Sequence, residues 1–159
     1  FLYSMTGQHD EAILHGEKAV ALNPNSAECH YRLGKVLSFA GRWKESILEY
    51  ERAIRLNPIP PNKYMFSLGI AYGSMGQHDE AIEWCEKAVR QEPNSIVARI
   101  LMTQVYVYAG KDEKARAEAE EILRIQPKFS LAVHAKKITY KNREDVERAV
   151  NALRKAGLK

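Results

Sequence analysis

Apolar residues recur along the chain at intervals that are typical of amphipathic helices. Over residues 27–40 they are Tyr31, Leu33, Val36, Leu37, Phe39 and Ala40, and over residues 43–56 they are Ile47, Leu48, Tyr50, Ala53 and Ile54. We therefore predict one helix over residues 27–40 and another over residues 43–56. Gly41 ends the first because glycine readily takes a positive φ, and Asn57-Pro58 ends the second because proline disfavours helix at the residue before it.

This two-helix pattern repeats along the chain. The prolines Pro24, Pro58, Pro93 and Pro127 and the glycines Gly7, Gly41, Gly76 and Gly110 both step by 34, 35 and 34 residues. Small residues keep the same step at Ala12, Ser46, Ala81, Ala115 and Ala149, and the heptapeptide GQHDEAI occurs at residues 7–13 and 76–82. The one-residue slip falls at Ile59-Pro60-Pro61, between two units. A period of this length indicates a repeat architecture.

Small side chains let two helices cross closely, and we assign that role to Gly34 and Gly69 against alanine or serine in the second helix of each unit. A single hairpin cannot bury its own apolar face, so neighbouring hairpins must stack. We therefore predict an all-α fold, an α-solenoid of antiparallel helix hairpins that forms one domain over residues 1–159. Its units are a partial repeat at 1–26, repeats at 27–61, 62–95 and 96–129, and a degenerate repeat with a terminal capping helix at 130–159.

The last unit departs from the pattern. Its apolar residues predict a first helix over residues 130–140, and Asn142 is placed to cap the next helix, with Asp145 answering three residues on. That second helix has a single apolar stripe and ends at Gly157; the stripe consists of Val146, Ala149, Val150 and Leu153. The polar outer face is typical of the end of a solenoid.

The repeat resembles the tetratricopeptide repeat (TPR). The third unit carries the family's motif almost completely, in Leu68-Gly69, Tyr72, Gly76, Ala81, Ala88 and Pro93, and the first is truncated, with Tyr3 and Gly7 near its start. The resemblance spans almost the whole chain. It implies a right-handed superhelix whose concave face, lined by the first helix of each unit, recognises proteins or peptides.

The resemblance also implies a set of partner-binding residues on that face: Tyr31, Lys35, Phe39, Phe66, Ile70, Ile100, Gln104 and Tyr108. The groove is unusually apolar, and it lacks the Lys, Asn and Arg set with which some family members clamp a C-terminal carboxylate. An exposed apolar stripe has two interpretations, which stay open here. It is a groove for an amphipathic helix or apolar peptide, or it is covered by superhelix curvature, by a neighbouring segment or by self-association.

The closing residues, YKNREDVERAVNALRKAGLK, look similar to the C-terminal ends of TPR regions in certain large bacterial signalling proteins. Those regions follow an adenylate/guanylate cyclase domain or a winged-helix transcription domain. The resemblance implies an alternative function, as the regulatory C-terminal module of a larger bacterial protein. The chain opens in mid-motif at Phe1, which suggests further sequence upstream.

Charge is unevenly distributed. Residues 130–159 hold eight Lys/Arg and three Asp/Glu, a local charge of +5, whereas residues 1–129 hold sixteen and seventeen, a charge of −1. This distribution argues against a nucleic-acid footprint along the whole chain; the basic end is either a solvated cap or a contact for an acidic partner. No apolar stretch approaches the roughly 18 residues that a membrane span needs. Cys29 and Cys85 fall in different repeats, which predicts reduced thiols and fits a cytoplasmic location.

Candidate catalytic and metal-binding residues have simpler explanations. His9 and His78 share a repeat position with Trp43, which favours a packing role, and Cys29-His30 lacks further ligands at zinc spacing. The sequence contains no nucleophile elbow, phosphate-binding glycine loop or HExxH motif. We therefore expect a protein-binding scaffold or adaptor with no cofactor, no metal and no enzymatic activity.

Overall fold

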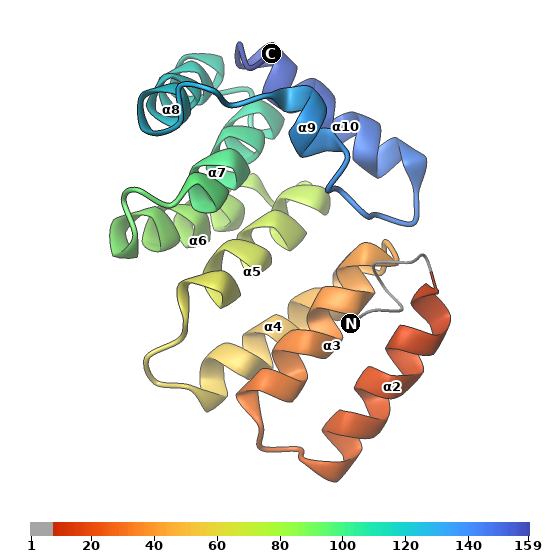
Figure 1. Ribbon diagram of the computed structural model, residues 1–159. Helices are drawn as coiled ribbons and strands as arrows, with labels where there is room; N and C mark the ends of the chain where they lie inside the picture. The colour runs from red at the N-terminus through yellow and green to blue at the C-terminus, as the bar shows by residue number, and fades with distance from the viewer. Residues whose placement is uncertain (1–7) are drawn as a thin grey trace.

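The computed structural model describes residues 8–159, which form nine α-helices and no strand (Figure 1). The helices are α2 (His9–Leu22), α3 (Ala27–Phe39), α4 (Trp43–Leu56), α5 (Asn62–Ser74), α6 (His78–Gln91), α7 (Ile96–Tyr108), α8 (Asp112–Ile125), α9 (Leu131–Ala135) and α10 (Arg143–Lys155). The motif positions Tyr3 and Gly7 lie outside the described residues. No helix within residues 8–159 has the length and apolar character that a bilayer span requires.

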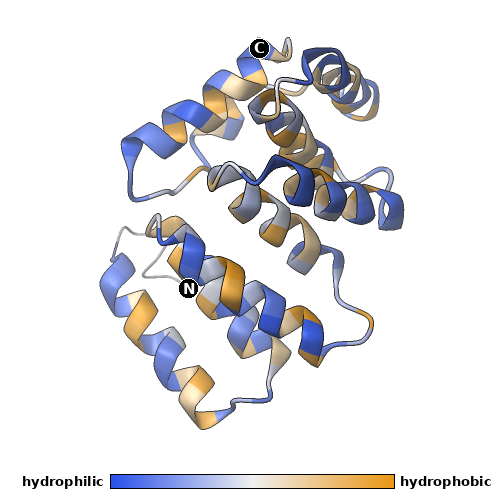
Figure 2. Cartoon of the chain, turned by 180° about the vertical axis from the view of Figure 1, so that it is seen from behind, coloured by the Kyte–Doolittle hydropathy of each residue, from blue (hydrophilic) through white to orange (hydrophobic). Residues whose placement is uncertain are grey.

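Antiparallel hairpins stack in sequence order. The pairs α3–α4, α5–α6 and α7–α8 each pack internally, and α2, α4 and α6 pack against the helix that follows them. Helices α3, α5 and α7 thereby lie side by side along one face, with α4, α6 and α8 behind them (Figure 1). Apolar positions form stripes along the helices, with polar positions between them (Figure 2). The predicted all-α solenoid is confirmed.

The glycine column makes the turn inside each hairpin. Gly41, Gly76 and Gly110 have φ of 77°, 76° and 70°, in the left-handed region. The N–H of Arg42, the residue after Gly41, donates to the Leu37 carbonyl at 2.9 Å, and the Gly41 N–H donates to Ser38 at 3.0 Å. These are the two hydrogen bonds of a Schellman motif. The predicted end of the first helix of each of these hairpins is therefore confirmed, and so is the helix over residues 43–56.

Close crossings between paired helices depend on the predicted glycines. A Cβ at Gly34 would lie 2.7 Å from the Tyr50 ring, and one at Gly69 would overlap the Cys85 sulfur. Behind these crossings lies a continuous core that runs from α3 to α10. Its fully buried large side chains include Tyr50, Leu68, Met102, Ile122, Leu153 and Leu158.

The predicted helix over residues 130–140 is wrong. Helix α9 has only five residues, Leu131–Ala135, and residues 136–142, which we call the strap, cross to the second hairpin as turns and irregular chain. In the earlier hairpins, the position where the two helices cross closely is filled by Gly34, Gly69 and the fully buried Thr103. In the last unit Lys137 occupies this position. A long, charged side chain cannot enter a close helix crossing.

Helix α10 begins after Asn142, as predicted, but the cap differs. The Asn142 side chain accepts no capping hydrogen bond; its amide donates to the Asp145 carboxylate at 3.4 Å. In the predicted stripe Ala149 and Leu153 are buried and Val146 and Val150 half-buried. Gly157 closes the helix with φ 106°. The helix packs mainly against α7, so the C-terminal segment turns back onto the fourth repeat.

Candidate protein-binding groove

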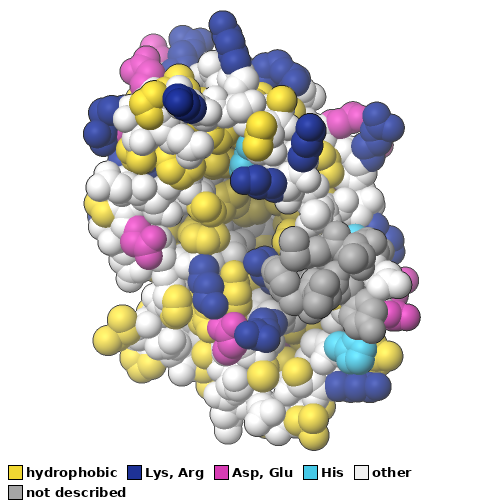
Figure 3. All heavy atoms as spheres, in the orientation of Figure 1, with side chains coloured by type: hydrophobic (Ala, Val, Ile, Leu, Met, Phe, Trp, Pro, Cys, Tyr) yellow, Lys and Arg dark blue, Asp and Glu magenta, His cyan; other side chains and the backbone are white. Residues whose placement is uncertain are grey.

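A cavity of about 270 Å3 opens on the face formed by α3, α5 and α7. Figure 3 shows this hollow, with hydrophobic side chains on its floor and Lys or Arg side chains around its rim. The three helices supply Lys35, Ser38, Phe39, Ser67, Ile70, Val97, Leu101 and Gln104, and the C-terminal segment supplies His134, Lys137, Ile138, Thr139, Tyr140 and Ala149. Trp43 and Tyr50 of α4 complete the lining. The cavity therefore joins the concave face to the strap.

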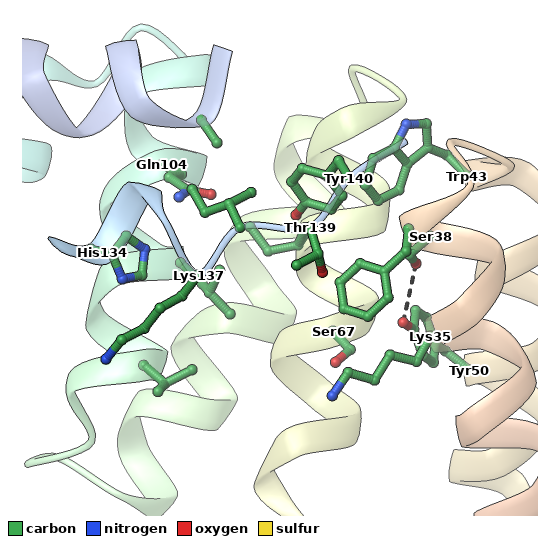
Figure 4. Close-up of a pocket in the computed structure, with 16 residues that line it drawn as sticks. Lys35, Ser38, Trp43, Tyr50, Ser67, Gln104, His134, Lys137, Thr139 and Tyr140 are labelled. Carbon is green, nitrogen blue, oxygen red and sulfur yellow. Dashed lines mark hydrogen bonds between the residues drawn. The ribbon is translucent and has the colours of Figure 1, made fainter. Parts of the chain in front are cut away.

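Aromatic side chains support one end of the cavity. The Tyr31 ring is stacked on Tyr64 at a centroid distance of 4.5 Å and lies 5.9 Å from Tyr50. The Tyr50 hydroxyl is within 3.1 Å of the Ser38 hydroxyl, so one of them donates to the other (Figure 4). Burial raises the pKa of Tyr50, which keeps this hydroxyl neutral. The cluster gives the wall a rigid, hydrogen-bonded backing.

The mouth of the cavity is basic. The amines of Lys35 and Lys137 lie on the same side of it (Figure 4), and no Asp or Glu is among its described lining residues. Burial lowers the pKa of Lys35, and the nearby charge of Lys63 lowers it further. Lys63 itself is paired with Glu28 at 3.1 Å. The groove thus combines an apolar wall with cations at its opening.

The strap forms the remaining wall. Tyr140 lies against Trp43 and Phe39, with centroid distances of 5.4 and 6.0 Å, and the Lys141 N–H donates to the Phe39 carbonyl at 2.7 Å. The Lys141 amine is 3.5 Å from the Asp10 carboxylate on α2. These contacts tie the C-terminal segment to α2, α3 and α4.

The eight predicted partner-binding residues lie in different surroundings. Lys35, Phe39, Ile70 and Gln104 line the cavity, and Tyr31 is buried behind it. Ile100 is buried beside a neighbouring pocket between α7 and α9. Phe66 and Tyr108 are half-buried outside these two pockets, and Arg148 of α10 lies 5.5 Å above the Tyr108 ring. The structure therefore brings half of the predicted set together around one cavity.

Sequence reasoning missed Thr139 and Tyr140, which line the strap side of the groove. Thr139 and Tyr140 were assigned to a helix, and no local signal in the sequence places them against Phe39 and Trp43. Ser38 lies one residue before Phe39 on α3 and lines the same cavity. Among the described residues, no group of three or more His, Cys, Asp or Glu side chains is arranged to hold a metal ion.

Comparison with known proteins agrees with this architecture. The tetratricopeptide-repeat family model matches residues 27–59 and 63–95. A crystal structure of the MamA protein is 32% identical, with a TM-score of 0.67, over 79% of this chain and 68% of that one. No curated protein sequence matches the chain.

Two further solved structures share the fold at lower identity. YrrB, described as a TPR protein with an unusual peptide-binding site, is 22% identical over 98% of this chain and 79% of that one, with a TM-score of 0.66. The first TPR domain of Spaghetti (RPAP3), bound to the HSP90 peptide SRMEEVD, is 20% identical over 82% of this chain and 90% of that one, with a TM-score of 0.62.

Proposed function

Because the chain belongs to the tetratricopeptide-repeat family, we propose that it is a scaffold or adaptor whose concave groove binds a segment of a partner protein. The observation that carries the proposal is the cavity on the face of α3, α5 and α7, with Ile70, Val97 and Leu101 in its lining. The two structures of the same fold that are described with a peptide or a peptide-binding site support this use of the face.

The size of the cavity favours side chains of a peptide over a free small molecule. Pockets for drug-sized ligands measure roughly 300–1,000 Å3, and this cavity measures about 270 Å3. It therefore has room for one or two side chains. The rest of the bound segment would lie along the open face beside the cavity.

The positive charges at the mouth of the cavity favour a partner segment that carries a negative charge. Lys35 and Lys137 flank the apolar wall, so the mouth of the cavity is positively charged. A carboxylate brought by the partner would stabilise the charged form of Lys35, whose pKa burial has lowered. We therefore propose a partner segment with an apolar side chain next to an aspartate or glutamate.

The first experiment identifies the partner and then measures its affinity. A photo-crosslinking amino acid at position 101, in the cavity wall, traps the bound segment for identification by mass spectrometry. Isothermal titration then compares the wild type with Ile70→Ala and Leu101→Ala, which truncate side chains of the cavity lining and are each expected to weaken binding by about 1 kcal/mol or more. Leu48→Ala, a change of an exposed side chain on the opposite helix layer, is the matched control. Unchanged affinity in both groove variants would exclude this binding mode.

Removing the charge of Lys137 tests whether the partner segment is acidic. Lys137→Gln should weaken binding of the same partner, and raising the salt concentration should reduce the difference from wild type, because salt screens partly exposed charges. Lys44→Gln, on the exposed side of α4, should leave the affinity unchanged. Equal affinities for the wild type and Lys137→Gln at low salt would contradict an acidic partner.

A second candidate function is that of a regulatory C-terminal module in a larger bacterial signalling protein. The similarity of residues 140–159 to the ends of TPR regions in such proteins supports it. Sequencing the full gene tests it directly. A cyclase or winged-helix domain upstream would favour this function, and an upstream sequence with neither would exclude it.

A further inference from the structure

The strap makes the contacts with α3 that a bound peptide would make. Its Lys141 N–H donates to the Phe39 carbonyl at 2.7 Å, and its Tyr140 ring packs on Trp43 at 5.4 Å. Its Lys141 amine is 3.5 Å from Asp10. In peptide recognition, main-chain hydrogen bonds contribute affinity and side-chain pockets contribute specificity. One segment of this chain therefore supplies both kinds of contact to a different repeat.

The receiving surface has the features of a small binding slot. The Phe39 carbonyl is one of the last four of α3, which have no partner within their own helix. The rings of Phe39 and Trp43 form its aromatic walls, and Gly41 leaves room for the Asn142 side chain at the end of the strap. A Cβ at Gly41 would lie 2.8 Å from the side-chain amide nitrogen of Asn142. The slot formed by Phe39, Gly41 and Trp43 thus accepts an extended chain with one aromatic side chain.

The strap's own sequence does not force it into this slot. Residues 131–142 contain no proline or glycine, and their apolar pattern predicts a helix as far as Tyr140. The residues beyond are held independently, because Leu153 and Leu158 are fully buried in the main core. Residues 136–142 can therefore leave the slot while α10 stays in place.

We propose that the slot formed by Phe39, Gly41 and Trp43 is a peptide-binding site that the strap occupies within the chain, and that its external ligand is an extended segment with an aromatic residue followed by a basic one. The inference rests on the proposed function and deepens it. The aromatic residue takes the place of Tyr140 and the basic residue reaches Asp10. The rest of the ligand extends over the part of the cavity lining that α5 and α7 supply, which stays in place when the strap leaves. Because a tethered occupant competes at an effective concentration of about millimolar, contacts in the cavity are needed for displacement.

The test uses the strap as its own probe. A fluorescein-labelled peptide with the sequence of residues 136–143, KKITYKNR, is titrated against the wild type and Tyr140→Ala, with binding followed by fluorescence anisotropy. Removing the internal competitor should strengthen binding at least about tenfold. Adding Phe39→Ala to Tyr140→Ala should abolish the gain, and a peptide with alanine in place of tyrosine should not bind.

Tyr72→Ala is the matched control, because this tyrosine lies on α5 outside the cavity and its hydroxyl donates to Glu51. It should bind the peptide as the wild type does. Equal peptide affinity for the wild type and Tyr140→Ala, or the same gain in Tyr72→Ala, would overturn the inference.

Two measurements remain decisive if Tyr140→Ala does not fold. Lys141→Pro removes the N–H that donates to Phe39 and keeps the tyrosine, so peptide binding should rise several-fold. In the wild type, excess peptide should accelerate hydrogen exchange of the Lys141 amide, observed by NMR. Exchange that is unaffected at saturating peptide would show that the strap is not displaced.

Failure of this inference is separable from failure of the proposed function. A partner whose affinity falls in Ile70→Ala, together with a strap that the peptide never displaces, leaves the groove function in place and removes the slot. A peptide that binds strongly only in Tyr140→Ala supports the slot, even if no partner's affinity depends on Ile70 or Leu101.

Discussion

Helix pairs α5–α6 and α9–α10 occupy equivalent places in the repeat but fold differently. Helix α5 has 13 residues and lies against α6 through Gly69, whereas α9 has five and is followed by the strap. The repeat position of Gly69 holds Lys137 in the last unit, and that of Gly76 holds Glu144. Where the small residues are present, neighbouring sequence is enough to build a hairpin. Where they are missing, contacts with a distant repeat decide the conformation.

Replacing one buried leucine in α5 and one in α10 tests whether both helix pairs contribute similarly to the stability of the shared core. Leu68 on α5 and Leu153 on α10 are fully buried in the same cluster. Leu68→Ala and Leu153→Ala should each lower the free energy of unfolding by about 2–5 kcal/mol, because both lose apolar burial and leave a cavity. Urea denaturation followed by circular dichroism gives the values. A loss below about 0.5 kcal/mol in Leu153→Ala, the range of surface substitutions, would make α10 a loosely attached end.

A second comparison concerns the glycines that end α5 and α10. Gly76 and Gly157 have φ of 76° and 106°, and a Cβ added at either meets no atom within 4 Å. Gly76→Ala and Gly157→Ala should therefore destabilise through backbone strain alone, by about 1–2 kcal/mol each. Thermal melting compares them with Ala132→Gly, an exposed position on α9. A stable Gly157→Ala variant beside a destabilised Gly76→Ala would show that the C-terminal turn is not required.

The smallest expected effect is a pH dependence that both ends of the described chain share. Burial lowers the pKa of both His9 and His134. The positive charge of Lys141 lowers the pKa of His9 further, and that of Lys137 lowers the pKa of His134 further. The unfolded chain, with a histidine pKa of about 6.5, then binds more protons as the pH falls. Stability from these histidines is therefore present above about 6.5 and lost as the pH falls towards the folded pKa.

Urea denaturation between pH 7.5 and 5.5 measures this effect. The wild type should lose more stability over this interval than His9→Gln or His134→Gln, because each variant removes one proton-binding difference between the folded and unfolded chains. His15→Gln, at an exposed position on α2, is the control. A pH dependence identical in all four proteins would contradict the role assigned to burial.

The candidate site was predictable on the side that belongs to the repeats. Lys35, Phe39, Ile70 and Gln104 line the cavity because their positions recur in each first helix, and periodicity places them on one face. Tyr140 was not predictable. Its partners Phe39 and Trp43 lie about a hundred residues earlier in the chain, and local patterns contain no information about contacts at that separation.

The sequence by itself determined the helices, their turns and their stacking order, because each depends on residues within one repeat: apolar spacing, a glycine that accepts positive φ, and small side chains at crossings. Only the tertiary structure decided the end of α9, the path of the strap and the shape of the groove. The apolar pattern of residues 136–140 predicts a helix, but the contact of Tyr140 with Phe39 and Trp43 and the hydrogen bond from Lys141 hold them in turns and irregular chain.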